Sequence, residues 1–177
     1  MTQVYRSDDP EPDVGPHVNL YAAGRQYLSA YQVLGQHTAE GETSQRLVLP
    51  MSALLAFAIE LFLKAILSQR GWSKKQLSHI DLRHQLGKLY ASACAEGLTP
   101  VPHIQALISV LDEKHAAHSF RYMGEDDNFD LLKHDLVSGV MDVLHFQVRQ
   151  MLGFETTDPS KPLATPDASL QNSIENG

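Results

Sequence analysis

The sequence has too little cysteine for a cross-linked or cysteine-caged domain. Cys94 is the only cysteine among 177 residues, which excludes an internal disulfide and a zinc site built from several cysteines. A chain without disulfides is typical of a reducing compartment. The N-terminal stretch MTQVYRSDDPEPDVGP also lacks the apolar segment of a secretory signal. We therefore expect a cytoplasmic protein.

Common catalytic motifs are also missing. No Gly-rich phosphate loop, no Ser-His-Asp order and no paired-carboxylate motif is evident in the sequence. The acidic stretch GEDDNFD, residues 124–130, lacks the ligand spacing of an EF-hand loop. The sequence therefore predicts no cofactor and identifies no catalytic residue.

The strict alternation of apolar and polar residues that marks β-strands is absent, whereas helical spacing recurs along the chain. Helices are expected over residues 18–34, 50–70, 81–95, 104–122 and 132–152. Pro50 is expected in the first turn of the second helix, after a loop over residues 36–46. The predicted fold class is therefore all-α, an up-and-down bundle of four to five helices over residues 17–152.

The net charge of −7 comes mostly from two tails. Residues 1–16 and residues 153–177 each contain one basic and four acidic side chains, so each tail has a net charge of −3. Both tails also contain several prolines, and we expect these termini to be disordered. The helical region between them is left with a charge of about −1.

A basic segment lies within that helical region, at residues 70–88 (RGWSKKQLSHIDLRHQLGK). It contains five basic side chains, Arg83 among them, against Asp81 alone, which gives a net charge of +4 with His79 and His84 beside it. Such a segment can attract the phosphates of nucleotides or RNA. A solvated loop and helix face has the same composition, so both interpretations stay open.

The most apolar stretch, AFAIELFLKAIL at residues 56–67, contains two charges, Glu60 and Lys64. With its N-terminal neighbours it is long enough to cross a bilayer, but both charges near the bilayer centre would cost about 5–7 kcal/mol. We therefore expect the central helix of a soluble bundle and no membrane partner. The two residues stand four apart with the acid first, the favoured order for a pair on one helix face. Their apolar neighbours predict a polar crevice or the edge of the bundle.

Three stretches in this order, AIELFLKAILSQRG, RHQLGKLYASACAEGL and LDEKHAAHSFRY, resemble the HEPN domain family. Its members are small helical bundles, often encoded beside nucleotidyltransferases or within toxin and defence systems. The resemblance covers residues 18–150 and implies a HEPN-like bundle, a homodimer or a nucleotidyltransferase-type partner protein. The residues implied for ligand binding are Glu60, Lys64, His84, Arg121 and Tyr122, to which the basic segment adds Arg83.

The chain departs from the family pattern in two places. The His-Asp-Leu motif of the family reads His84-Gln85-Leu86 here, and HIDL at residues 79–82 competes with it, so the equivalent histidine is either His79 or His84. The ribonuclease branch of the family has an arginine followed four to six residues later by a histidine, for phosphate binding and proton transfer. No arginine of this chain has a histidine at that spacing, which argues against that activity.

Asp112, His115 and His118 share one face of the fourth expected helix and offer a carboxylate and two imidazoles to a metal ion. The two histidines also continue the apolar stripe of that helix. A position at the boundary of the core explains them without a metal. We therefore expect no metal site.

Three functions remain, in the following order. The first is a noncatalytic HEPN-like module in which the basic segment, with Lys64, His84 and Arg121, binds a nucleotide or RNA phosphate, as part of a toxin-antitoxin or defence system. The second is a protein-interaction bundle whose polar cluster fixes the helix register. The third is a degenerate ribonuclease, in which Arg121 holds phosphate and the base is His84, His115 or His118.

Overall fold

The computed structural model describes residues 15–38, 42–117 and 133–154, and these residues form helices, turns and no strand. The predicted all-α class is therefore confirmed. The helices are α1 (Pro16–Thr38), α2 (Glu42–Gln69), α3 (Lys74–Leu77), α4 (Leu86–Ala95), α5 (Ile104–Ala116) and α6 (His134–Met151).

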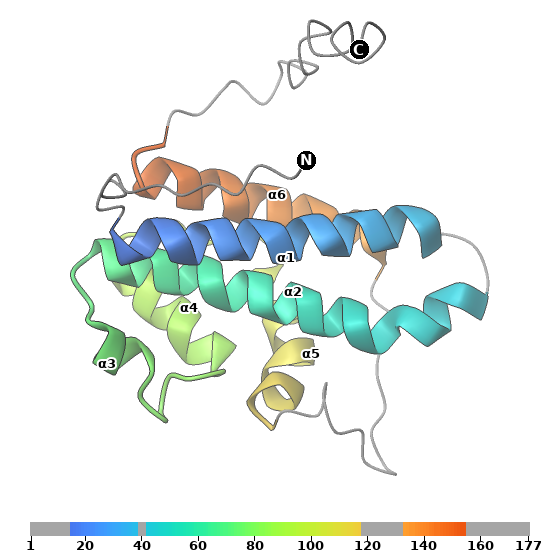
Figure 1. The fold of residues 1–177 in the computed structure, drawn as a ribbon, viewed down its shortest axis with the longest axis horizontal. Helices are drawn as coiled ribbons and strands as arrows, with labels where there is room; N and C mark the ends of the chain where they lie inside the picture. Colours follow the sequence, from blue (N-terminus) through green and yellow to red (C-terminus); the bar gives the residue numbers. More distant parts are fainter. Residues whose placement is uncertain (1–14, 39–41, 118–132, 155–177) are drawn as a thin grey trace, which may run out of the picture.

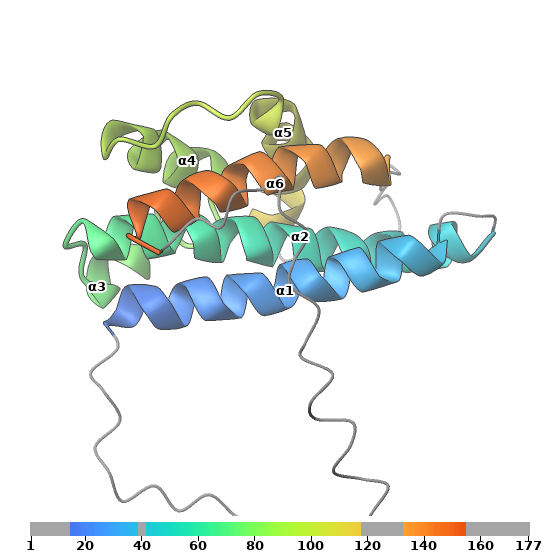
Figure 2. The same cartoon turned by 90° about the horizontal axis from the view of Figure 1, so that it is seen from above.

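The apolar helix α2 forms the centre of the fold. It contacts each of the other five helices, and α1 runs antiparallel along its length (Figure 1). Seen from above, α1 covers one side of α2, whereas α4 and α5 cover the opposite side and α6 a third (Figure 2). Within the described residues, α2 is the one helix long and apolar enough to cross a membrane, over Leu47–Gln69. In this fold its apolar side chains supply the middle of the core.

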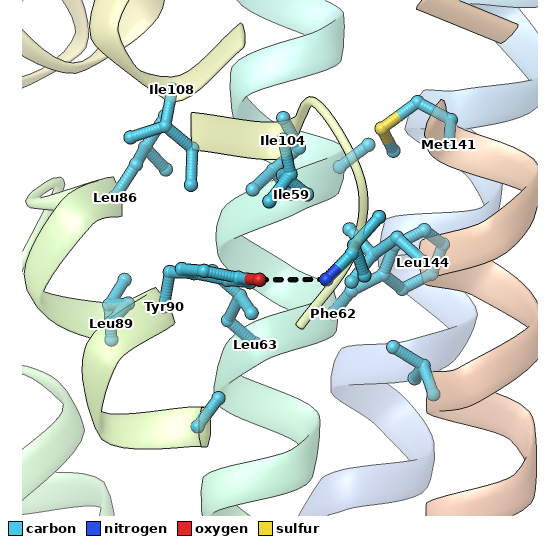
Figure 3. Close-up of a cluster of buried hydrophobic side chains, with 14 of the residues drawn as sticks. Ile59, Phe62, Leu63, Leu86, Leu89, Tyr90, Ile104, Ile108, Met141 and Leu144 are labelled. Atoms are coloured by element: carbon cyan, nitrogen blue, oxygen red, sulfur yellow. Dashed lines mark hydrogen bonds between the residues drawn. The ribbon is translucent and has the colours of Figure 1, made fainter. Parts of the chain in front are cut away.

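The core packs α4 and α6 against opposite sides of the central helix α2, as Figure 3 shows. Leu89 and Tyr90 of α4 approach α2 from one side, and Leu144 of α6 approaches it from the other. Ile59 and Phe62 of α2 lie between them and are completely buried. The Tyr90 hydroxyl accepts a hydrogen bond of 2.9 Å from the backbone N–H of Val101. This bond satisfies a buried polar pair and fixes the loop that leads into α5.

The start of α2 differs from the prediction. The helix begins at Glu42, so residues 42–46 are helical rather than part of a loop, and Pro50 lies inside the helix. An internal proline removes one backbone hydrogen bond, at a cost of about 3 kcal/mol. Pro50 is on an exposed side of the helix. A proline in such a place therefore does not mark the start of the helix, contrary to the prediction from the sequence.

The basic segment also differs from the prediction. A single-turn helix, α3, begins after Ser73, whose side chain forms a capping box with Gln76. This extra turn raises the number of helices in the described parts of the chain to six. The next helix begins at Leu86 instead of Asp81, because His84 has a φ of 63° and this left-handed conformation cannot continue a helix.

The other predicted boundaries are close to the observed ones. The last helix begins at His134 rather than residue 132, and α5 ends at Ala116. Helix α5 therefore stops before the predicted end at residue 122, with Ala117 as its C-cap, and residues 118–122 lie outside the described residues. The same holds for most of both predicted tails, residues 1–14 and 155–177.

Candidate functional site

A buried carboxylate on the central helix collects three donors from three parts of the chain. Glu60 Oε1 lies 2.5 Å from Lys64 Nζ, one turn further along α2. Glu60 Oε2 lies 2.9 Å from His84 Nδ1, in the loop before α4, and 2.6 Å from His115 Nε2 on α5. The Glu60 side chain is only 4% exposed. These three interactions replace the water that the carboxylate would otherwise bind.

Glu60 is ionised in this environment. Burial alone would raise the pKa of its carboxyl, but the hydrogen bond from His115 and the charge of Lys64 outweigh burial and lower the pKa well below the usual range. An ionised carboxylate can only accept hydrogen bonds. His84 therefore donates its Nδ1–H and His115 donates its Nε2–H, which fixes the proton position on each imidazole.

Aromatic packing holds both imidazoles in place. The His84 and His115 rings meet edge to face, with centroids 5.0 Å apart. Phe57, one turn before Glu60 on α2, packs its ring edge to face against both of them. Tyr27 of α1 stacks on the outer side of Phe57 at 5.3 Å. Phe57 therefore covers one side of the polar cluster, and this apolar neighbour strengthens the electrostatic interactions of the cluster.

Access to solvent differs within the cluster. The side chain of His115 is 2% exposed, whereas the side chains of Lys64 and His84 are 12% and 18% exposed. A ligand at the surface can therefore reach the edges of Lys64 and His84. Glu60 and His115 lie behind them and orient them.

A second contact with α5 positions the loop that contains His84. Asp112, one turn before His115, accepts hydrogen bonds from the backbone N–H groups of Leu86 at 2.6 Å and Gly87 at 3.2 Å. These are the first residues of α4, and no side chain at its N-cap position, Gln85, makes this bond. Asp112 thus caps α4 from another helix and fixes the loop beside Glu60.

The structure brings together three of the predicted ligand-binding residues, Glu60, Lys64 and His84. His84 rather than His79 binds Glu60, because His79 is exposed and pairs with Asp81 at 3.3 Å. Arg83 is exposed, and its side chain is not among the three partners of Glu60. Arg121 and Tyr122 lie outside the described residues.

From the sequence we grouped His115 with Asp112 and His118 rather than with Glu60. The expected face shared with Asp112 and His118 does not form a described cluster, because Asp112 caps α4 and His118 lies outside the described residues. The apolar stripe of α5 was the signal that could have found the true partner. Since that stripe packs on α2, it turns His115 towards Glu60, a buried charge on that helix.

The basic segment, residues 70–88, includes His84 of this cluster and presents several basic side chains to solvent. Its exposed basic side chains are Arg70, Lys74, Lys75, Arg83 and Lys88. Among the residues that the structure describes, no ion pair joins any of them to a carboxylate. A surface hollow of about 350 Å³ lies in the same segment, lined by Trp72, Lys75, Gln76, His79, Asp81 and Leu82. The Trp72 indole N–H donates to Glu96 at 3.0 Å, which fixes the ring at this hollow.

Comparison of the chain with protein-family models, with curated proteins and with solved structures found no match in any of the three. The fold itself shows an all-helical bundle over the described residues. The HEPN resemblance remains an expectation from the sequence.

Proposed function

We propose that this protein is a noncatalytic, HEPN-like module that binds the phosphates of RNA or of a nucleotide through its basic segment, residues 70–88. The observation that carries this proposal is the set of exposed basic side chains without carboxylate partners among the described residues. When such side chains bind phosphates, they displace the counterions that surround the RNA. The release of these ions drives association with RNA.

The hollow at Trp72 supports a nucleic-acid ligand over a simple anion. It offers an aromatic ring beside Lys75 and His79. Proteins that bind single-stranded nucleic acids combine a positively charged groove with aromatic rings on which bases stack. We therefore expect single-stranded RNA or a nucleotide, with the phosphate near Lys75 and the base near Trp72.

The Glu60 cluster has a supporting role in this proposal. It holds His84, near the C-terminal end of the basic segment, against the central helix through a 2.9 Å hydrogen bond. Lys64 and His84 also present their partly exposed edges to solvent. The cluster thus orders one end of the basic surface, and the Lys64 ammonium adds a donor for phosphate oxygens.

Charge reversal within the hollow tests the proposal. We expect Lys75→Glu to weaken binding of a fluorescent single-stranded RNA, measured by anisotropy, by about tenfold or more, since it replaces an attraction to phosphate by a repulsion. Lys133→Glu, an equal charge change at an exposed residue outside the basic segment, is the control and should have a much smaller effect. Equal losses in both variants, or no RNA binding by the wild type, would contradict the proposal.

The resemblance also carries the proposals about partners and setting. We propose a cytoplasmic protein without a membrane partner, in a toxin-antitoxin or defence system. It acts as a homodimer or with a nucleotidyltransferase-type protein. Multi-angle light scattering of the purified full chain tests the homodimer, which predicts about 39 kDa, twice the 19.6 kDa of one chain. A molar mass that stays at one chain at micromolar concentration contradicts it.

RNA cleavage is the second candidate, because one carboxylate orients two imidazoles in contact with each other. Glu60 holds the proton of His84 on Nδ1, and this leaves Nε2 as the basic nitrogen for proton transfer. Slow cleavage of RNA in the presence of a chelator, lost in His84→Asn, would support this candidate. Intact RNA after incubation with equimolar protein would exclude it while leaving the binding proposal unaffected.

A further inference from the structure

We propose that Glu60, His84 and His115 form a binding site for a transition-metal ion, with Zn²⁺ as the best fit. Each of the three residues offers one ligand atom, and these atoms all lie within 4.8 Å of one another. Two imidazole nitrogens with one carboxylate oxygen are a ligand set that zinc uses in proteins, with a fourth position left to water or a ligand. Mg²⁺ and Ca²⁺ prefer oxygen ligands, so the two imidazoles select against them.

The observed distances allow this coordination after small side-chain movements. Bonds of about 2.1 Å at tetrahedral angles place two zinc ligands about 3.4 Å apart. His115 Nε2 and His84 Nδ1 now lie 2.6 Å and 2.9 Å from Glu60 Oε2, at hydrogen-bond distance. Each nitrogen therefore needs to move outward by less than about 1 Å. The metal then takes the place of the two protons that join the imidazoles to the carboxylate.

The position of Lys64 is compatible with a metal on the other side of the carboxylate. Lys64 binds Oε1, whereas both histidines meet Oε2. A zinc-bound carboxylate commonly has its second oxygen held by a hydrogen-bond donor, which orients the ligand. The Lys64 ammonium repels the metal cation and so lowers the affinity of the site for the metal. Since the Lys64 side chain is partly exposed, its charge can move towards water when the metal binds.

Two further features preorganise the three ligands. The backbone of His84 is left-handed, with φ of 63°, and directs its side chain from the turn towards the core of the bundle. This backbone conformation costs free energy for a residue other than glycine. Phe57 packs against both imidazoles and restricts their rotation. Binding then loses little side-chain entropy, because the three ligand atoms already converge in this structure.

Calorimetric titration of the full chain with Zn²⁺ alone, in a buffer without nucleotide or RNA, tests this site. We expect one ion per chain. A concentration of free Zn²⁺ about 100 times the Kd should raise the melting temperature by about 5 °C or more. His84→Asn should weaken the affinity by on the order of 100-fold, since asparagine tolerates the left-handed backbone but removes one imidazole ligand.

His79→Asn is the matched control, an exposed histidine in the same segment, and it should leave the Zn²⁺ affinity within about twofold of the wild type. If His84→Asn does not fold, the visible spectrum of the Co²⁺-loaded wild type decides, because four-coordinate Co²⁺ gives intense bands and six-coordinate Co²⁺ does not. Zn²⁺ affinity retained in His84→Asn, no saturable binding, or six-coordinate Co²⁺ would overturn the proposal. RNA binding measured with a chelator tests the proposed function separately.

Discussion

Glu60 is a full negative charge inside the core, and it depends on three donors for its stability. A buried charge that loses its partners lowers the stability of the fold by several kcal/mol. A buried charge with partners can have almost no net effect on stability. Lys64, His84 and His115 supply those partners from α2, the loop before α4 and α5. One residue thus connects the central helix to two neighbouring parts of the chain.

Neutralising this residue should destabilise the fold strongly. We expect Glu60→Gln to lower the free energy of unfolding by about 2–4 kcal/mol, because Lys64 and two N–H donors lose an ionised acceptor. Urea unfolding followed by circular dichroism gives this value. Glu113→Gln, at an exposed position of α5, is the control and should change stability by less than about 0.5 kcal/mol. A similar small effect for both variants would show that the cluster does not hold the fold together.

His145 is a partly buried histidine with a different role. Its Nε2 lies 2.9 Å from the Tyr21 hydroxyl, and its ring stacks on Phe62 with centroids 5.4 Å apart. Burial, together with the positive charges of Arg25 and Arg149, lowers its pKa from the ordinary value of 6.5 to about 4. His145 is therefore neutral at pH 7 and shares a hydrogen bond with the Tyr21 hydroxyl.

This histidine should make stability depend on pH. The unfolded chain binds a proton at His145 below about pH 6.5, whereas the folded chain resists it down to about pH 4. The stabilisation is complete above pH 6.5 and is lost as the pH falls towards 4, by on the order of 1–2 kcal/mol after discounting the partial exposure of the ring. Thermal unfolding across this range should show a smaller pH slope in His145→Gln than in the wild type. An unchanged slope in His145→Gln, with His79→Gln as control, contradicts this assignment.

At the scale of the elements, α4 begins where another helix caps it. Asp112 of α5 accepts two of the first backbone N–H groups of α4, a task that the residue before the helix usually performs. The cap also sets the direction of the loop that contains His84. The start of α4 and the Glu60 cluster are therefore coupled through α5.

Removing this cap should loosen α4. We expect Asp112→Ala to lower the free energy of unfolding by about 1–2 kcal/mol, because two N–H groups lose their acceptor, and Asp112→Asn to cost less because its amide oxygen still accepts. Chemical denaturation of both variants checks this order. Ser109→Ala, on an exposed face of the same helix, controls for the loss of a polar side chain. Equal stability of Asp112→Ala and the wild type would contradict the cap.

Features that depend on local sequence patterns could be predicted, whereas features that depend on long-range contacts could not. The Glu60–Lys64 pair could be predicted because it needs only the repeat of one helix. The role of Asp112 could not, since Leu86 and Gly87 lie on another element and meet it only after folding. The break at His84 was also hidden, because a left-handed conformation is expected at glycine and seldom at histidine. Tertiary contacts decided both features.

At the scale of the whole molecule, the apolar helix α2 has two functions. Its apolar residues form the middle of the core, and Glu60 links that core to the loop at the end of the basic segment. The segment itself remains exposed, with its hollow beside Trp72. A rigid core thus holds one end of a surface suited to phosphates.

The measurement that tests this account most directly is the salt dependence of RNA affinity. Each basic side chain that contacts a phosphate contributes about one unit to the slope of log Kd against log salt concentration. We predict saturable binding of a single-stranded RNA of about ten nucleotides, with a slope that falls by about 1–2 in Lys74→Ala/Lys75→Ala and stays unchanged in Lys133→Ala. No binding at low salt, or the same slope in the wild type and both variants, would contradict the account.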